Sequence, residues 1–509
     1  MQWIIHQGIK KYYSGFVLLF LHFLPISHAE VSLPPIFGSH MVLQHGREIQ
    51  FAGTAAPGEK IKFTLGNETK NTIADGIGRW SVRFSPRQPS FKPVNLTIEG
   101  NNKLIFEDIL FGDVWLCSGQ SNMQWTLKDS IGGPSLARSP DLQNIRLLHL
   151  RGRPQTQGRE FQENELAKCN PHDYMAGAWE AISPASALEF SGVAIFFGQE
   201  LMQSQNIPVG LVQNAVGGTP IESWLSLETI SGDPGLKPFL EKDWYSNEMV
   251  HVFCRERALV NLKKISTELK LARPPASHPY HPGFMFESGI RPLEQMQIKG
   301  VIWYQGESNA HDPALYRIMF PKLVQSWRAF FRQPQLPFLF VQLPNFQNAI
   351  NWPEIREIQR KTSAMNSTGM AVTIDVGSPA DVHPQDKAPV GHRLALLARA
   401  MVYREPIESS GPIMQSAILR NNVVDIQFTH AVKGLKTKDG EPPAGFEIAG
   451  TDGVFRPITA EIRKNAIFIS AANIDVSIVR YGWSQNPVCN LVNAEGLPAS
   501  PFQVRVSSK

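Results

Sequence analysis

The chain has 509 residues, of which 42% are hydrophobic, 10% aromatic and 18% charged. This apolar fraction is enough to build sizeable cores, so the composition excludes a wholly disordered protein. Lysine and arginine (49) nearly balance aspartate and glutamate (45), and no basic run stands out, so the charge pattern gives no sign of nucleic-acid binding.

The N-terminus has the layout of a secretory signal. Lys10 and Lys11 precede an apolar run from Phe16 to Ile26, and the small-residue sequence Ser27-His28-Ala29 follows. The run is shorter than the roughly 20 apolar residues that a membrane-spanning helix needs. We therefore predict a signal peptide over residues 1–29 and a secreted or periplasmic mature protein without a membrane span. An uncleaved anchor is the alternative.

Residues 30–107 contain short strand-like segments separated by turn sequences. The predicted strands are Glu48–Ala52, Lys60–Leu65, Trp80–Phe84 and Val94–Glu99. Short strands at this regular spacing predict an N-terminal β-domain.

From residue 108 to residue 405, apolar strand candidates alternate with helical patterns. The strand candidates are Val114–Cys117, Val209–Ala215, Gly300–Tyr304, Phe338–Leu343 and Met370–Asp375. The helical candidates are Gly192–Gln205, Cys254–Leu271, Ala314–Arg332 and Lys387–Tyr403. This alternation predicts an α/β domain, in which helices cover both faces of a central, mostly parallel sheet.

After residue 406 the short strands return. The candidates are Val423–Phe428, Gly445–Ile448, Ala466–Ser470 and Val476–Tyr481. They predict a C-terminal β-domain over residues 406–509.

Four loops at predicted strand ends carry the candidate chemistry, because the functional groups of an open parallel sheet belong beyond the carboxyl ends of its strands. Together these loops hold a hydroxyl, a glycine pair, a side-chain amide and an Asp–His pair. Each feature alone is explained by a turn or a helix cap, but acyl transfer needs all of them in one place. The loops are Ser118–Met123, Gln213–Thr219, Trp303–Asn309 and Asp375–Pro384.

Segments of these loops closely resemble the four sequence blocks of the sialate O-acetylesterase family, a carbohydrate-esterase branch of the SGNH hydrolases. The segments are Ser118–Met123, Gly217–Trp224, Trp303–Asn309 and Asp381–His383, in that order along the chain. Asn490–Pro498 resembles, more weakly, the closing β-domain of that family. The resemblance implies an SGNH-type central sheet and an exported serine esterase that removes O-acetyl groups from sialic acids without a cofactor.

The resemblance also assigns catalytic roles. It implies that Ser121 is the nucleophile and His383 the general base. In the wider SGNH superfamily the usual fourth block separates its aspartate from its histidine by two residues, whereas this chain has one residue between them. The orienting acid therefore stays open: Asp381 is the first choice and Asp375 the rival, and a backbone carbonyl in their place would leave a Ser–His dyad.

For the oxyanion hole, the resemblance implies the Ser121 N–H, a glycine N–H from Gly217-Gly218 and a side-chain amide. We assign the amide to Gln305, because a carboxylate at Glu307 would repel an oxyanion, and keep Asn309 as the fallback. The predicted substrate-binding residues are Trp224, Glu307 and Asn309. Trp224, Trp303 and Tyr304 could form a sugar-stacking wall, although aromatic residues near strand ends more often belong to the core.

Other interpretations remain at this stage. The substrate could be acetylated xylan or another acetylated glycan, and the protein could be a non-catalytic carbohydrate-binding protein. A thiol nucleophile at Cys117 is weaker, because this residue lies inside an apolar strand. We interpret His278 and His281, in a proline-rich loop, as structural and predict no metal site. An acidic sugar would need a cation in the pocket, and the sequence alone does not identify which arginine supplies it.

Overall fold

The computed structural model describes residues 30–241, 243–263, 278–471 and 474–508. The predicted signal peptide, residues 1–29, and the end of the predicted helix Cys254–Leu271 lie outside the described residues. Within those ranges, no helix combines the length and the apolar character that a bilayer crossing requires.

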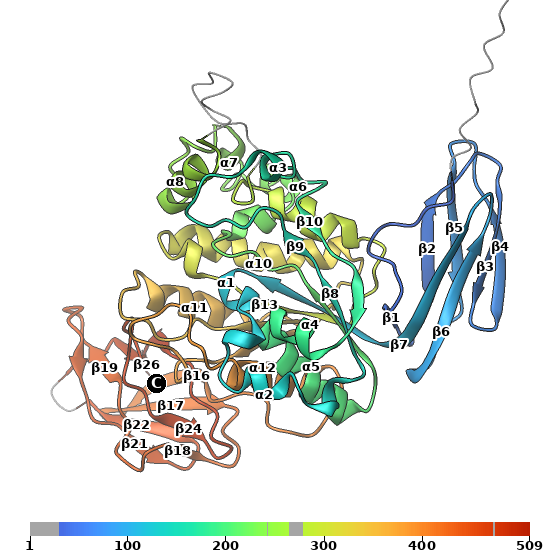
Figure 1. The fold of residues 1–509 in the computed structure, drawn as a ribbon. Coiled ribbons are helices and arrows are strands. Elements are labelled where there is room, and N and C mark those ends of the chain that lie inside the picture. Colours follow the sequence, from blue (N-terminus) through green and yellow to red (C-terminus); the bar gives the residue numbers. More distant parts are fainter. Residues whose placement is uncertain (1–29, 242, 264–277, 472–473, 509) are drawn as a thin grey trace, which may run out of the picture.

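The fold is a mixed α/β fold built on a large mixed sheet (Figure 1). At its centre six parallel strands run in the order β8-β12-β7-β13-β14-β15, and β11 pairs antiparallel with β8 at the edge. Every residue of β12 to β15 is buried, as expected for apolar strands covered on both faces. The strands are β7 (Lys103–Gly119), β8 (Ile145–His149), β11 (Trp179–Ala181), β12 (Val209–Gln213), β13 (Gly300–Tyr304), β14 (Phe338–Val341) and β15 (Thr368–Ala371).

Helices pack on both faces of this sheet (Figure 1), and two tryptophan contacts identify which helices lie on which face. Trp115 of β7 contacts Phe197 of α5 (Gly192–Gln205), with ring centroids 5.0 Å apart. Trp303 of β13 contacts Trp327 of α10 (Pro313–Phe330) at 5.5 Å. Trp303 pairs with Ser118, which lies an odd number of residues from Trp115, so the two indoles point to opposite faces. Next to α5 packs α12 (Ala388–Met401), and next to α10 packs α11 (Trp352–Thr362).

Strand β7 joins the N-terminal strands to the central sheet. Its first residues pair antiparallel with β6, and its last residues pair in parallel with β12 and β13. Side chains of residues 103–108 are alternately exposed, whereas every residue from Ile109 onward is buried. The predicted division at residue 107 therefore lies inside one continuous strand. The N-terminal strands are β1 (Val42–Gln44), β2 (Ile49–Thr54), β3 (Lys60–Leu65), β4 (Glu68–Ile73), β5 (Arg79–Phe84) and β6 (Ser90–Glu99).

The C-terminal strands surround a hydrophobic core of their own. Val424, Ile426, Ile467, Val479 and Phe502 are all fully buried within it. The strands are β16 (Ile413–Arg420), β17 (Val423–Thr429), β18 (Leu435–Thr437), β19 (Phe446–Ala449), β20 (Arg456–Pro457), β21 (Glu461–Arg463), β22 (Ala466–Ser470), β23 (Ile478–Tyr481), β24 (Leu491–Asn493), β25 (Phe502–Arg505) and β26 (Ser507–Ser508).

Short elements connect the central strands. The helices are α1 (Ser121–Gln124), α2 (Gly133–Leu136), α3 (Glu163–Leu166), α4 (Pro184–Glu189), α6 (Leu227–Ser231), α7 (Pro238–Glu241) and α8 (Val252–Asn261). Two short strands, β9 (Arg151–Gly152) and β10 (Met175–Ala176), form a separate pair.

Candidate active site

The structure brings Ser121 and His383 together although 262 residues separate them in the sequence. Ser121 opens α1 directly beyond the end of β7, and His383 lies in the loop between β15 and α12. His383 Nε2 lies 2.8 Å from Ser121 Oγ, and both residues line one open pocket. At this distance the imidazole can accept the hydroxyl proton.

The approach to Ser121 depends on a glycine. Gly119, the last residue of β7, has a φ of +140°, which favours glycine over any residue with a side chain. A Cβ atom at this position would lie 2.1 Å from the backbone oxygen of Tyr304 on β13. Glycine thus allows β7 and β13 to stay paired up to the residue before the turn that presents Ser121.

His383 is held by an aromatic ring and a nearby carboxylate. The Trp125 indole stacks on the imidazole, with centroids 5.4 Å apart and planes 18° from parallel. Asp381 Oδ1 accepts the backbone N–H of His383 at 2.8 Å and lies 3.5 Å from Nδ1. Burial lowers the pKa of His383, and the Asp381 carboxylate opposes that shift. The imidazole is therefore neutral, and ready to act as a base, at neutral pH.

The rival acid, Asp375, has a different partner. Both of its carboxylate oxygens accept hydrogen bonds from the Arg393 guanidinium, at 2.6 and 2.7 Å. The structure therefore places Asp381, and not Asp375, beside His383.

Asn122 ties three segments of the site together. Its Nδ2 donates to Glu307 Oε1 at 2.7 Å and to the backbone oxygen of Val382 at 2.9 Å. Its Oδ1 accepts from Lys387 Nζ at 2.6 Å. Burial lowers the pKa of Lys387 to about 7 and raises the pKa of Glu307. Asn122 thus fixes the nucleophile helix to the third loop and to the loop that carries His383.

The first glycine of the pair, Gly217, lies against the nucleophile. A Cβ atom on Gly217 would lie 3.6 Å from the Cβ of Ser121. The Gly217 N–H donates to Gln124 Oε1 at 2.8 Å. Within the described part of the chain, the N–H groups of Ser121 and Gly218 make no hydrogen bond, and both residues line the pocket.

Three predicted site residues lie outside the pocket. Gln305 is fully buried, and its Nε2 donates to Asn309 Oδ1 at 2.7 Å. Asn309 Nδ2 in turn donates to Glu222 Oε2 at 2.9 Å. Trp224 has no exposed surface and donates through Nε1 to Thr219 Oγ1. The prediction has to be corrected here, because these side chains belong to the packed interior and do not line the pocket. Trp303 and Tyr304 are buried as well, as the core interpretation of these aromatics expects.

The sequence interpretation missed a side-chain amide that lines the pocket directly beside the nucleophile. Gln120 immediately precedes Ser121, and its Oε1 accepts the Ser308 N–H at 3.3 Å. This contact leaves Nε2 as the end of the amide that can donate to a ligand. Its position beside the nucleophile is the signal that could have found it. The stacking indole of Trp125, four residues after Ser121, gave no comparable signal.

The alternative nucleophile and the two loop histidines have structural contacts. Cys117 is fully buried in β7, and burial raises the pKa of its thiol, so no thiolate is available there. His278 Nε2 hydrogen-bonds with Asn261 Oδ1, and its ring stacks on Phe161. His281 Nδ1 contacts its neighbour, the backbone oxygen of Pro282.

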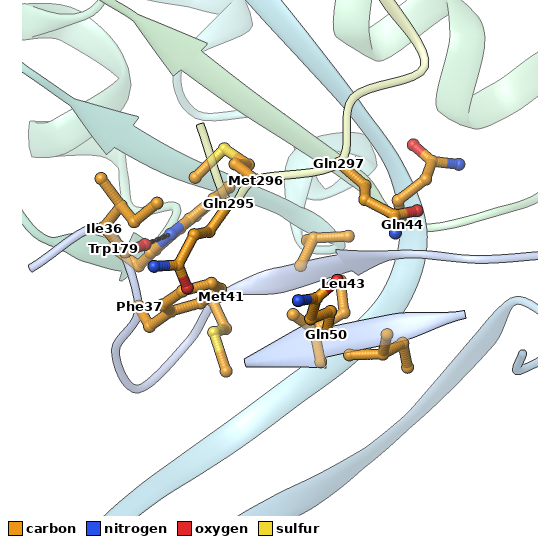
Figure 2. Close-up of a pocket in the computed structure, with 12 residues that line it drawn as sticks. Ile36, Phe37, Met41, Leu43, Gln44, Gln50, Trp179, Gln295, Met296 and Gln297 are labelled. Atoms are coloured by element: carbon orange, nitrogen blue, oxygen red, sulfur yellow. Dashed lines mark hydrogen bonds between the residues drawn. The ribbon is translucent and has the colours of Figure 1, made fainter. Parts of the chain in front are cut away.

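A second pocket lies where the N-terminal segment packs against the central part of the chain (Figure 2). Apolar side chains and glutamine amides line it, and no titratable side chain is among them. It therefore supplies neither a base nor an activated nucleophile. Its lining residues are Ile36, Phe37, Met41, Val42, Leu43, Gln44, Ile49, Gln50, Trp179, Gln295, Met296 and Gln297.

Comparison with known proteins decides the family. The model of the carbohydrate esterase family described as sialic acid-specific acetylesterase matches residues 111–249 and 276–401, more than half of the chain and all four loops. The chain belongs to this family. The match contains both Ser121 and His383, so the 2.8 Å contact lies inside the family's own domain.

The matches between this esterase and its relatives cover nearly the whole of its chain. The sialate O-acetylesterase of Rattus norvegicus is 31% identical, over 92% of this chain and 94% of its own. The sialate O-acetylesterase of Homo sapiens is 28% identical, over 88% of each chain. A carbohydrate acetylesterase from Xanthomonas citri is 32% identical and superimposes with a TM-score of 0.76, over 93% of this chain and 99% of its own.

Proposed function

We propose that this esterase is an exported sialate O-acetylesterase of the SGNH type, in which Ser121 and His383 form and hydrolyse an acetyl-enzyme. The observation that carries the proposal is the 2.8 Å contact between His383 Nε2 and Ser121 Oγ at the wall of an open pocket. The sialate O-acetylesterases among its relatives support sialic acid as the substrate.

In the first step, Ser121 Oγ attacks the carbonyl carbon of the acetyl ester while its proton passes to His383 Nε2. The negative charge develops on the carbonyl oxygen. Three groups donate hydrogen bonds to this oxygen: the N–H groups of Ser121 and Gly218, and the Nε2 amide of Gln120, which takes the role predicted for Gln305. Donors fixed before the reaction stabilise this charge without having to reorganise.

The tetrahedral intermediate then collapses. The bond between the acetyl carbon and the sugar oxygen breaks, and His383 returns its proton to the leaving alcohol. A water molecule next attacks the acetyl-enzyme, with His383 taking its proton. When the bond to Ser121 Oγ breaks, acetate leaves and the serine hydroxyl recovers the proton.

Asp381 supports this cycle mainly through its charge. Its side chain is 55% exposed, and its 3.5 Å separation from His383 Nδ1 is long for a hydrogen bond. The site therefore works as a Ser–His dyad with a nearby carboxylate that favours the imidazolium, rather than as a rigid triad.

A second candidate substrate is an acetylated neutral glycan such as acetylxylan. It is favoured by the relative from Xanthomonas citri, whose name specifies a carbohydrate acetylesterase and no sialic acid. The pocket is also open rather than enclosed around one sugar.

The test measures acetate release from O-acetylated sialic acid and from acetylated xylan by the purified protein. Ser121→Ala and, as a matched control, Ser130→Ala, a hydroxyl that does not line the pocket, are assayed beside it. We expect faster release from the sialate, abolished by Ser121→Ala and kept by Ser130→Ala. Acetate release from acetylated xylan alone would mean that the substrate is an acetylated neutral glycan and not a sialic acid. Sugar binding without release from either ester would favour a non-catalytic carbohydrate-binding protein.

A further inference from the structure

Among the described residues, the pocket that contains Ser121 is lined by a single arginine or lysine, Arg257. This residue lies on α8, outside the four loops that resemble the family blocks. The other basic lining groups are the imidazoles of His251 and His383. Arg257 is therefore the one permanent positive charge at this wall.

The guanidinium of Arg257 is held in place without being neutralised. Its Nη1 donates to the backbone oxygen of Thr156 at 2.8 Å, and its Cζ lies 4.9 Å from the centroid of the Phe253 ring. Within the part of the chain that the structure describes, no aspartate or glutamate forms an ion pair with it. A guanidinium has five N–H donors, so most remain available to a ligand.

Hydrogen bonds connect this arginine to the nucleophile wall. Thr156, whose backbone oxygen accepts from Arg257, donates through Oγ1 to the backbone oxygen of Gly217 at 2.9 Å. Tyr280 OH donates to the same oxygen at 3.0 Å. Gly217 lies directly beside Ser121. The cation and the nucleophile thus belong to one wall, with Thr156 and Gly217 between them.

We propose that Arg257 binds the carboxylate of an O-acetylated sialic acid while Ser121 attacks the acetyl ester. The inference rests on the proposed function and adds the residue that selects an acidic sugar. Sialic acid carries its carboxylate at one end of the carbon chain and the acetylated hydroxyls elsewhere, so its site needs a cation set apart from the nucleophile. A planar guanidinium matches a carboxylate through paired, charge-assisted hydrogen bonds.

Two carboxyl groups, Asp129 and Glu307, also line the pocket and would oppose an anionic substrate if both were charged near it. Asp129 stays with its own loop, where its side chain accepts a hydrogen bond from Thr126 Oγ1. Burial raises the pKa of Glu307, which favours its neutral form. These two carboxyl groups therefore only weakly repel an anionic substrate bound at Arg257.

The test compares an O-acetylated sialic acid with its methyl ester, which has the same acetyl group and no carboxylate charge. Arg257→Gln and Arg257→Lys are measured beside the wild type. Arg255→Gln is the matched control, because Arg255 lies on the same helix and donates to the backbone oxygen of Val250 but does not line the pocket. The measured quantity is the ratio of kcat/KM for the acid to kcat/KM for the methyl ester.

We expect Arg257→Gln to lower this ratio by roughly tenfold or more, mainly through KM for the acid, since a charge-assisted pair is worth about that factor. Arg257→Lys retains part of the ratio, and Arg255→Gln retains all of it. If the ratio is unchanged in Arg257→Gln while the wild type deacetylates the sialate, Arg257 is not the carboxylate site, and the proposed function still stands. A wild type that deacetylates only neutral glycans overturns the proposed function, and the carboxylate site with it.

Discussion

Asp381 and Asn122 flank the dyad and act on it by different physical means. Asp381 is exposed and influences His383 through its charge, whereas Asn122 is buried and holds three segments in register. Replacing Asp381 and replacing Asn122 should therefore change two different measured quantities. The first should move a pH profile and the second should lower the turnover rate.

Asp381→Asn tests the role of the charge. His383 must be neutral to act as a base, so kcat/KM falls as pH drops through the pKa of its imidazole. Asp381 raises that pKa against the lowering effect of burial, and removing the carboxylate lets the pKa fall further. We expect the acidic limb of the kcat/KM profile to move to lower pH, and kcat on the plateau to fall about tenfold, far less than the 10⁴-fold cost of losing the aspartate of a rigid triad.

Asp386→Asn is the control for that profile. It removes a carboxylate from the same loop, and Asp386 is not among the groups that directly shift the pKa of His383. Its acidic limb should coincide with that of the wild type. A limb that moves upward in Asp381→Asn, or a kcat loss near 10⁴-fold, would contradict the proposed electrostatic role.

Asn122→Ala removes the side chain that fixes Ser121 relative to His383. We expect kcat to fall roughly 100-fold, because a displacement of about 1 Å between reacting groups has that cost. The free energy of unfolding should drop by about 2–4 kcal/mol, since Lys387 and Glu307 lose a buried partner. Asn214→Ala, which also removes a buried asparagine, should destabilise the fold while keeping kcat within a few-fold. Equal kcat values in the two variants would count against a positioning role.

Residue chemistry predicted the kinds of group at the site, and the family resemblance assigned the roles of Ser121 and His383, but neither identified all of their neighbours. The sequence has a serine after one buried strand and an Asp–His pair after another, and both are expected at the same edge of the sheet. The structure places Ser121 and His383 together there. Gln305 was chosen because its amide is neutral, yet the backbone directs that amide toward Asn309. Residue type identifies a possible donor, whereas its direction depends on backbone angles that a single sequence does not show.

At the scale of elements, the end of β7 determines where the nucleophile lies. Gly119→Ala should lower the free energy of unfolding by roughly 2–5 kcal/mol and reduce kcat, because the added Cβ would collide with the Tyr304 oxygen on β13 at a positive φ. Gly132→Ala is the matched control, since its φ is also positive but no atom lies within 4 Å of the added Cβ. It should cost only about 1 kcal/mol and leave kcat unchanged. Similar losses in both variants, measured by denaturant unfolding, would refute the close-approach argument.

Elements with a clear apolar period were predictable, and elements without one were not. The predicted helix Gly192–Gln205 coincides with α5, and the predicted strand Gly300–Tyr304 coincides with β13. In contrast, β8 contains Arg146, and β11 is a three-residue edge strand, so neither shows an apolar run. Helix α11 was also missed, because buried Arg356 and Glu357 interrupt its apolar pattern.

At the scale of the whole molecule, the loop between β23 and β24 is linked through Asn345 to the loop that carries His383. Asn486 Oδ1 accepts a hydrogen bond from Asn345 Nδ2, and Asn345 Oδ1 accepts the N–H of Gly377. Buried Arg356 adds hydrogen bonds to the backbone oxygens of Ser484 and Gln485. The Asn345 contacts support the His383 loop from outside the central sheet, although the described C-terminal core contributes no residue to the pocket.

The meeting of Ser121 with His383 across the molecule is tested most directly by trapping the acetyl-enzyme. The wild type is quenched in acid during turnover of an acetyl ester, and its peptides are analysed by mass spectrometry. We expect one acetyl group on the peptide that contains Ser121, absent from Ser121→Ala and strongly reduced in His383→Ala. Acetyl-enzyme on a different residue, or undiminished hydrolysis by Ser121→Ala, would contradict it.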